Sequence, residues 1–191
     1  MEVNVIQKSE FGGTVSFSRL DAEYVWKSRW NIEKKLGGID GQPLSDLVLE
    51  YGGPTLNDSF CAEDNLVRYI DIDSVDTSDG LAYADELRYE DRPSRAKYQL
   101  IENDLLVSNV RPNRGAITII GKFRAGALAS SGFSLLRDKA LKDAPQEYLF
   151  AFLKTFYGRT QLKRRCRGSM YPAITFSDGV DECRHKLVRC F

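Results

Sequence analysis

The stretch Leu105-Leu-Val-Ser-Asn-Val-Arg-Pro-Asn-Arg-Gly-Ala-Ile-Thr-Ile-Ile120 decides the fold, because it holds two apolar runs around one turn. Leu105 to Val110 and Ala116 to Ile120 are rich in aliphatic and β-branched residues, which is typical of strands. Pro112-Asn-Arg-Gly115 lies between the two runs and consists of turn-forming residues. We therefore predict two strands joined by this turn.

Three further strands are predicted on either side of this pair. Val67 to Val75 alternates apolar and polar residues, which is the strand pattern, and Asp76 to Gly80 supplies the turn after it. Phe133 to Leu136 follows a Ser-Ser-Gly turn, and Ala173 to Phe176 is the last short candidate.

The clearest helix is predicted to begin near Asp143, a suitable N-cap, with Pro145 and Glu147 in the first turns. The 3.6-residue spacing then gives one apolar face, made of Leu149, Phe152, Leu153 and Phe156. We expect Gly158 to end this helix and a basic helix to follow from Arg159 to Arg167.

The N-terminal part is expected to hold a small hairpin over residues 1–18 and a helix over 19–36 that contains Trp26 and Trp30. Pro43 to Leu49 is predicted to form a second short helix capped by Ser45. Together these elements indicate an α+β fold, a mixed twisted sheet with flanking helices. We expect a single domain over residues 1–178 and a C-terminal tail of uncertain structure over 179–191.

The bulk composition is that of an ordinary globular protein. The chain has 191 residues, 42% hydrophobic and 28% charged, with a formal net charge of zero, which argues against a uniformly basic DNA-coating protein. The spacing of Cys183, His185 and Cys190 matches no standard zinc pattern, so we expect no metal and no other cofactor. The four cysteines are expected to be reduced thiols, and the sequence shows no signal peptide and no long apolar run. We therefore predict a cytoplasmic protein without a membrane span.

Charge is segregated along the chain. Residues 57–91 contain eleven Asp or Glu against Arg68 and Arg88, whereas residues 92–124 contain seven Lys or Arg against Glu102 and Asp104. The region from Lys154 to Gly168 has no acidic residue. This distribution indicates basic surfaces that the net charge conceals.

The sequence contains none of the common catalytic motifs, so we expect no enzyme. No Pro-Pro occurs, as the base-gripping loop of an adenine-N6 methyltransferase needs, and Gly115 to Lys122 has the wrong spacing for a phosphate loop. His185 alone cannot make a Ser–His–Asp triad. A metal nuclease could use Asp71, Asp73 and Asp76, but the alternation favours a solvated strand face for them.

Two basic stretches interleaved with small polar residues favour DNA binding instead. Arg pairs bidentately with guanine and Asn with adenine in the major groove, while Lys and Arg also neutralise phosphates. The candidate DNA-binding residues are Arg92, Arg95, Lys97, Asn109, Arg111, Asn113, Arg114, Arg159, Lys163, Arg164, Arg167 and Ser169. The alternative is a basic helix face that is solvated or paired with the acidic stretch.

An ordered series of motifs resembles the target-recognition domain of type I restriction–modification specificity subunits. The most specific part is Arg92-Pro-Ser-Arg-Ala-Lys97 followed by Asn103-Asp-Leu-Leu-Val-Ser108, Val110-Arg-Pro-Asn113 and Gly115. The other similar segments are Arg19 to Tyr24, Pro43 to Leu47, Tyr69 to Ile72, Ala129 to Phe133, Pro145 to Phe156 and Gly168-Ser169. The resemblance covers roughly residues 19–178.

The resemblance implies a non-catalytic component that reads a double-stranded DNA sequence and directs a partner adenine methyltransferase, and in larger complexes a nuclease subunit, to it. A full specificity subunit has two recognition domains separated by long helices. The chain departs from this pattern, because it lacks a second recognition domain and the long helices. It is therefore expected to be a half-subunit or a truncated form, and alone it would have to form a homodimer to read two half-sites. The alternative function is a protein-interaction module of the same fold that has lost DNA binding.

Overall fold

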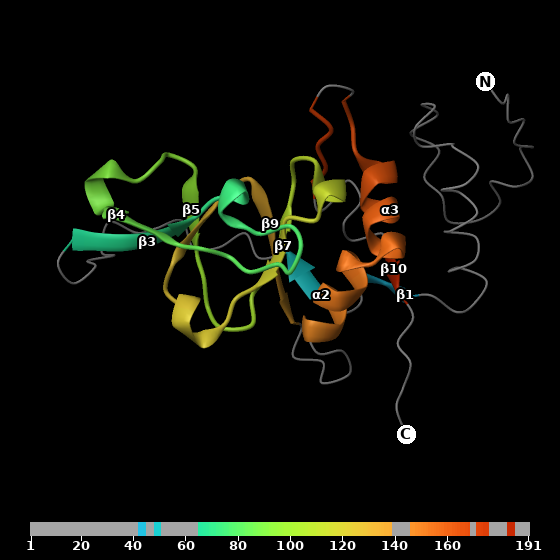
Figure 1. The fold of residues 1–191 in the computed structure, drawn as a ribbon, viewed down its shortest axis with the longest axis horizontal. Helices are drawn as coiled ribbons and strands as arrows, with labels where there is room; N and C mark the ends of the chain where they lie inside the picture. The colour runs from blue at the N-terminus through green and yellow to red at the C-terminus, as the bar shows by residue number, and fades with distance from the viewer. Residues whose placement is uncertain are drawn as a thin grey trace, which may run out of the picture.

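The computed structural model describes residues 42–44, 48–50, 65–138, 146–168, 171–175 and 183–185. This part of the chain is an α+β fold with two four-stranded sheets, a two-stranded pair and two helices, which confirms the predicted class. From left to right, Figure 1 shows an outer sheet, a central sheet and the helices. The predicted hairpin and helix of residues 1–36 lie outside the described residues.

The central sheet contains the predicted strand pair. Its strands run in the order β2 (Val48–Glu50), β9 (Phe133–Asp138), β6 (Leu105–Ser108) and β7 (Ile117–Ile119), and every pair is antiparallel. The 3-10 turn η6 (Pro112–Arg114) lies where the turn between β6 and β7 was predicted. The prediction for this stretch is therefore confirmed, with each strand two residues shorter than expected.

The outer sheet is the mixed one. Its order is β4 (Asp85–Arg88), β3 (Leu66–Ile70), β8 (Leu128–Ser130) and β5 (Ala96–Gln99), and only β3 and β8 are parallel. β3 ends earlier than predicted because Asp71 caps the 3-10 turn η4 (Ile72–Ser74). The Asp71 side chain accepts a hydrogen bond from the Ile72 amide at 2.8 Å, and this local bond replaces further strand pairing.

The central sheet is buried on both faces, which explains why β6 has no polar side. Leu105 and Val107 pack against helix residues such as Leu153, while Leu106 packs with Ile70 of the outer sheet. Each fully buried Leu or Val stabilises the fold by about 1.5–3 kcal/mol. The apolar run therefore reflects a middle layer rather than a half-exposed strand.

The two helices are α2 (Gln146–Lys154) and α3 (Phe156–Arg165). The predicted helix start at Asp143 and Pro145 lies outside the described residues, and Gly158 does not end a helix. Instead α2 stops at Lys154, and Thr155 caps α3 by accepting from the Gly158 amide at 3.2 Å. A Cβ at Gly158 would lie 2.5 Å from the Phe152 carbonyl oxygen, so the glycine permits the close turn between the helices.

Two other predicted elements differ in the structure. The prediction of a short helix over Pro43 to Leu49 is wrong, since Val48 and Leu49 belong to β2 and pair with β9. The strand expected from Ala173 is reduced to single bridges between Ala173 and both Val110 and Arg167. Backbone pairing with neighbouring segments, which local sequence does not encode, determines both outcomes.

Part of the expected tail packs on the body of the domain. β10 (Arg184–His185) pairs with β1 (Gln42–Pro43), and the Leu44 amide donates to the Cys183 carbonyl at 2.8 Å. Cys183 is fully buried beside the helices. The domain boundary at residue 178 stays a prediction, but Cys183 to His185 contribute to the fold.

Candidate nucleic-acid interface

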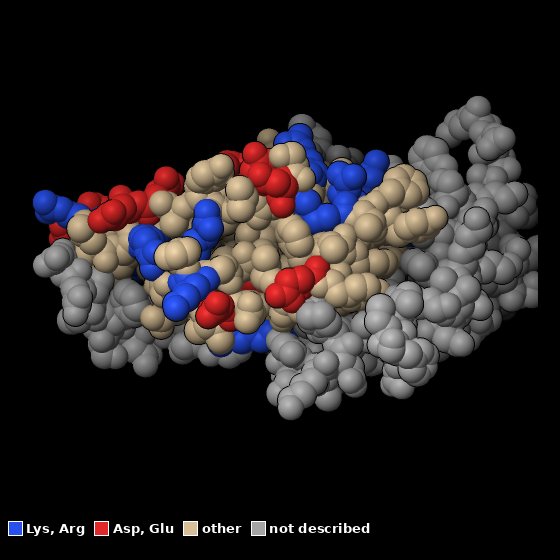
Figure 2. Space-filling view, turned by 60° about the horizontal axis from the view of Figure 1, so that its bottom comes forward, with Lys and Arg blue, Asp and Glu red and all other residues tan. Residues whose placement is uncertain are grey.

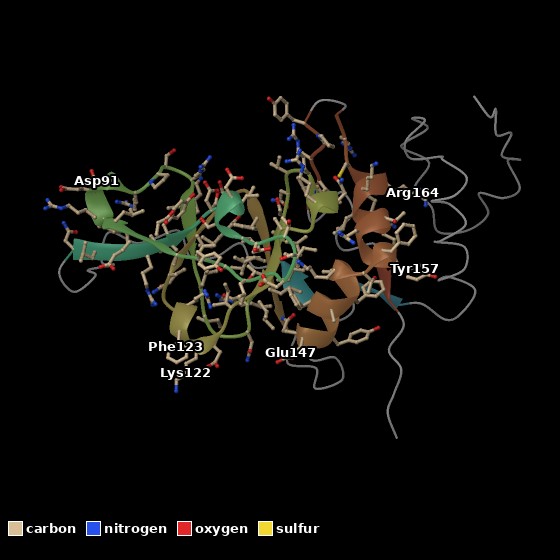
Figure 3. The ribbon with its side chains drawn as sticks, in the orientation of Figure 1. Asp91, Lys122, Phe123, Glu147, Tyr157 and Arg164 are labelled. Atoms are coloured by element: carbon tan, nitrogen blue, oxygen red, sulfur yellow. The ribbon has the colours of Figure 1, made fainter. Side chains whose placement is uncertain are left out.

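The candidate residues fall into two separate groups. Arg92, Arg95 and Lys97 follow η5 (Tyr89–Asp91) at the outer-sheet end, and we call them the β5 cluster. The second group lies where η6 packs on α3, and we call it the η6–α3 surface. It consists of Arg111, Asn113, Arg114, Arg159, Lys163 and Arg167. Figure 3 shows the distance between the groups, since Asp91 and Arg164 lie toward opposite ends of the molecule.

The η6 turn is held in an unusual backbone conformation. Arg111 and Gly115 flank the turn, and both are left-handed, with φ of 47° and 86°. A left-handed arginine is uncommon and costs conformational energy. Surrounding hydrogen bonds hold it there, because the Arg111 amide donates to the Pro172 carbonyl at 2.7 Å and the Arg114 amide to the Arg111 carbonyl at 2.9 Å.

The α3 side of the surface presents fewer cations than the sequence suggested. Arg159 and Lys163 are exposed, but Arg164 is 0% exposed and Arg165 is also buried. The helical repeat places Arg165 on the same side of α3 as Gln161 and Leu162, whereas Arg164 lies about 200° around the helix from Leu162 and is buried on another side. This corrects the prediction for Arg164, because a fully buried guanidinium cannot reach a phosphate.

The segment after α3 completes the surface. The Arg167 amide donates to the Ala173 carbonyl at 2.7 Å and the Ala173 amide to the Arg167 carbonyl at 2.8 Å, which fastens both ends of a loop. Arg167 and Tyr171 are exposed on it, and the Arg111 guanidinium lies over the Tyr171 ring at 5.0 Å. The predicted site residue Ser169 lies outside the described residues.

Lys154 at the end of α2 connects this surface to the rest of the fold. Its ammonium donates to the Thr77 carbonyl at 2.8 Å and to the Gly115 carbonyl at 3.2 Å. Burial, with the nearby Arg159 charge, lowers the Lys154 pKa, while Asp79 and Asp76 oppose that shift. Lys154 therefore fixes the position of Gly115, directly after η6.

The β5 cluster is occupied mainly with contacts inside the domain. Arg95 forms an ion pair with Asp71 and donates to the Tyr69 hydroxyl at 3.2 Å, and both interactions raise the Arg95 pKa, the Tyr69 bond most. The Arg92 guanidinium stacks over the Tyr89 ring at 3.6 Å and donates to the Tyr89 carbonyl. Lys97 is exposed on β5.

Asn109, another predicted reader, is half-buried at the end of β6. Its Oδ1 accepts a hydrogen bond from the Ser134 hydroxyl at 2.7 Å. Its backbone amide donates to the Gly132 carbonyl, and its backbone carbonyl accepts from the Ile174 amide. One of the two lone pairs of the side-chain oxygen that adenine recognition requires is therefore used within the fold.

The charge view shows cations on more than one part of the surface. In Figure 2, blue side chains gather above the centre, over the region of η6 and α3 in Figure 1, and a second group lies to the left. In Figure 3 the 3-10 turn η7 (Lys122–Arg124) presents Lys122 and Phe123 at the lower edge, and Arg68 donates to the Phe123 and Ala125 carbonyls. The seven cations counted between residues 92 and 124 therefore occupy several surfaces rather than one.

Two residues that sequence reasoning passed over belong to the η6–α3 surface. The sequence analysis assigned no role to Tyr171, and Lys154 was only the first residue of the stretch without acidic residues. No spacing rule relates either of them to η6, because both contacts join segments far apart in the chain. A tyrosine beside proline in a short loop after a basic helix is the only hint that the sequence offers.

Two further observations concern the described residues. Among them, no three His, Cys, Asp or Glu side chains come together as a metal site, and Cys166 and Cys183 are buried free thiols. No helix in the described ranges has the length and apolar character needed to span a membrane.

Comparison with known proteins gives structural matches. No family model matches the sequence, and no curated protein matches it. A chain solved in a study of complex assembly and conformational transition of the type I R-M system superposes with a TM-score of 0.64 and 25% identity, covering 78% of this chain. The HsdS subunit from Thermoanaerobacter tengcongensis superposes with a TM-score of 0.60 and 27% identity, covering 74% of this chain.

The present chain spans little more than a third of each solved chain, 37% and 36% respectively. The matches nevertheless include most of the present chain, and they agree with the resemblance that the ordered motifs indicated. This chain has the α+β target-recognition fold of the specificity subunits of type I restriction–modification systems.

Proposed function

We propose that this protein is a sequence-reading DNA-binding domain that confers target specificity within a type I restriction–modification system. The observation that carries the proposal is the packing of η6 on α3, which brings Arg111, Asn113 and Arg114 beside Arg159 and Lys163. A short turn with Arg and Asn side chains is suited to base edges, and an adjacent helix with exposed cations is suited to phosphates.

The division of roles follows from geometry and exposure. Arg111, Asn113 and Arg114 occupy a turn whose backbone is fastened on both sides, so they are the proposed base-reading residues. Arg159, Lys163 and Arg167 are exposed and are the proposed phosphate contacts. Arg164 is omitted because it is buried, and Asn109 because its Oδ1 already bonds Ser134. Arg92, Arg95 and Lys97 are kept as a second, weaker group of contacts.

In this proposal the chain carries out no chemistry itself. It delivers a partner adenine methyltransferase subunit, and in a larger complex a nuclease subunit, to the DNA sequence that it recognises. The likeness to a chain from a type I R-M assembly supports these partners. A homodimer is part of the proposal, in which two copies of this chain would read two half-sites.

The test is selection from a pool of random duplex DNA with the purified chain, at low and at physiological salt, followed by sequencing of the retained DNA. We expect an enriched motif that survives physiological salt, and binding that weakens as salt rises. The double variant Arg111→Ala/Arg114→Ala should lose the motif. Its matched control, Arg92→Ala/Arg95→Ala, should retain the motif while losing a small part of its affinity for all sequences alike, because these residues are proposed only as weaker contacts. Salt-independent retention, or retention without an enriched motif, would overturn the proposal.

A further inference from the structure

Tyr171 has a surface position that the core does not explain. Its side chain is 69% exposed, and the guanidinium carbon of Arg111 lies 5.0 Å from the centre of its ring. An aromatic ring this exposed gains little from burial, so its contact with Arg111 is its main described interaction with the η6–α3 surface. Guanidinium groups stack well on aromatic faces because both are flat and the ring face is electron-rich.

The backbone around this pair is fastened on both sides. The Arg111 amide donates to the carbonyl of Pro172, the residue after Tyr171, at 2.7 Å. Val110 and Ala173, the next residues outward, form an antiparallel bridge, and the Ile174 amide donates to the Asn109 carbonyl at 2.8 Å. The two segments are therefore paired through their backbones where the side chains stack, so the Cα positions of Arg111 and Tyr171 are held relative to each other.

Bidentate recognition of guanine requires an arginine whose guanidinium plane is aligned with the base edge. An unsupported arginine side chain samples many rotamers and loses that freedom on binding. A stacked ring restricts the guanidinium plane before DNA arrives. The left-handed backbone of Arg111, with φ of 47°, further indicates that the surrounding structure directs this side chain.

We propose that Tyr171 is a specificity-determining positioning residue, which holds the Arg111 guanidinium in the plane needed to read a guanine in the DNA target. The inference rests on the proposed function, because it requires that Arg111 reads a base. It goes further in assigning a role to Tyr171 and in naming guanine as the base that this pair discriminates.

The experiment compares the full chain with Tyr171→Ala, Tyr171→Phe, Arg111→Ala and the double variant. Each protein is measured on the selected motif, on motifs with single G·C pairs replaced, and on random duplex, at two salt concentrations. Arg111→Ala should lose about tenfold to a hundredfold of discrimination at one G·C position. Tyr171→Ala should lose about threefold to tenfold at the same position, since aromatic support of a cation is a modest effect.

Three controls separate positioning from folding and from phosphate contact. Tyr171→Phe keeps the ring and should retain discrimination. Tyr171→Ala should keep the melting temperature, the affinity for random duplex and the salt dependence. The double variant should discriminate at the G·C position as well as Arg111→Ala alone does, because both changes remove the same interaction between Arg111 and Tyr171.

The failures are distinguishable. If wild-type protein enriches no motif, the proposed function and this inference both fail. If Arg111→Ala loses discrimination while Tyr171→Ala does not, the proposed function stands and the inference is overturned. Uniform loss on all sequences with Tyr171→Ala, or loss with Tyr171→Phe equal to that with alanine, would also overturn it, because the ring would not be positioning Arg111.

Discussion

The β5 cluster and the η6–α3 surface contain the same kinds of residue, but the fold uses them differently. In the β5 cluster, Arg92 stacks on Tyr89. Arg95 forms an ion pair with Asp71 and donates to the Tyr69 hydroxyl. On the η6–α3 surface, Arg114, Arg159 and Lys163 are exposed. Proximity in sequence therefore says little about whether a cation is available to DNA.

The same contrast occurs within α3 itself. Lys163 and Arg164 are neighbours in a run of basic residues, yet Lys163 is exposed and Arg164 is fully buried. A turn of 100° per residue is enough to move a side chain from an exposed position on a helix to a buried one. Substitutions at Arg164, Arg111, Lys154 and Lys163 test this comparison.

Arg164→Ala should lower the free energy of unfolding by about 2–5 kcal/mol, because it empties a fully buried site in the helix layer. Urea denaturation followed by circular dichroism measures the change. Arg164→Met, which keeps most of the volume and removes the charge, should cost less. If both variants are as stable as wild type, Arg164 has no part in the core.

Arg111→Ala should weaken binding to the selected motif by about 1–3 kcal/mol if the side chain reads a base. Fluorescence anisotropy with the labelled motif measures the affinity. Arg95→Ala is the control, since Arg95 pairs with Asp71 at the opposite end of the molecule. Equal losses for the two variants would remove the distinction between the β5 cluster and the η6–α3 surface.

Lys154→Met should cost about 1 kcal/mol of stability, because two backbone carbonyls lose their hydrogen-bond donor. Because Lys154 donates to the Thr77 and Gly115 carbonyls, the variant should also show faster exchange of backbone amides. This faster exchange should be confined to residues around η6 and the Thr77 turn. Hydrogen exchange read by mass spectrometry tests this. Faster exchange spread over the whole domain would contradict a local role for Lys154.

Lys163→Ala should change stability by no more than about 0.5 kcal/mol, because the side chain is exposed. Its effect should appear in the salt dependence of DNA binding, where loss of one phosphate contact reduces the slope of log K against log salt by about 0.9. Motif and random duplex should weaken alike. An unchanged slope would mean that Lys163 does not contact phosphate.

Much of the local structure follows from sequence patterns. The apolar runs around Pro112 to Gly115 become β6 and β7, and the spacing of Leu149 and Leu153 predicts the buried face of α2. These predictions are confirmed because strand and helix periodicity are local properties of the chain. The boundary at Gly158 was wrong because the Thr155 cap and the close packing of α2 and α3 outweigh the usual tendency of glycine to end a helix.

The α+β class, the main strand pair, the two helices and the two basic stretches could all be predicted from residue patterns. The burial of Arg164, the pairing of Arg95 with Asp71 and the contact of Tyr171 with Arg111 could not. The difference is one of range, because periodicity and turn chemistry act between residues a few positions apart. Burial, ion pairing and stacking depend on contacts between segments that only the complete fold brings together.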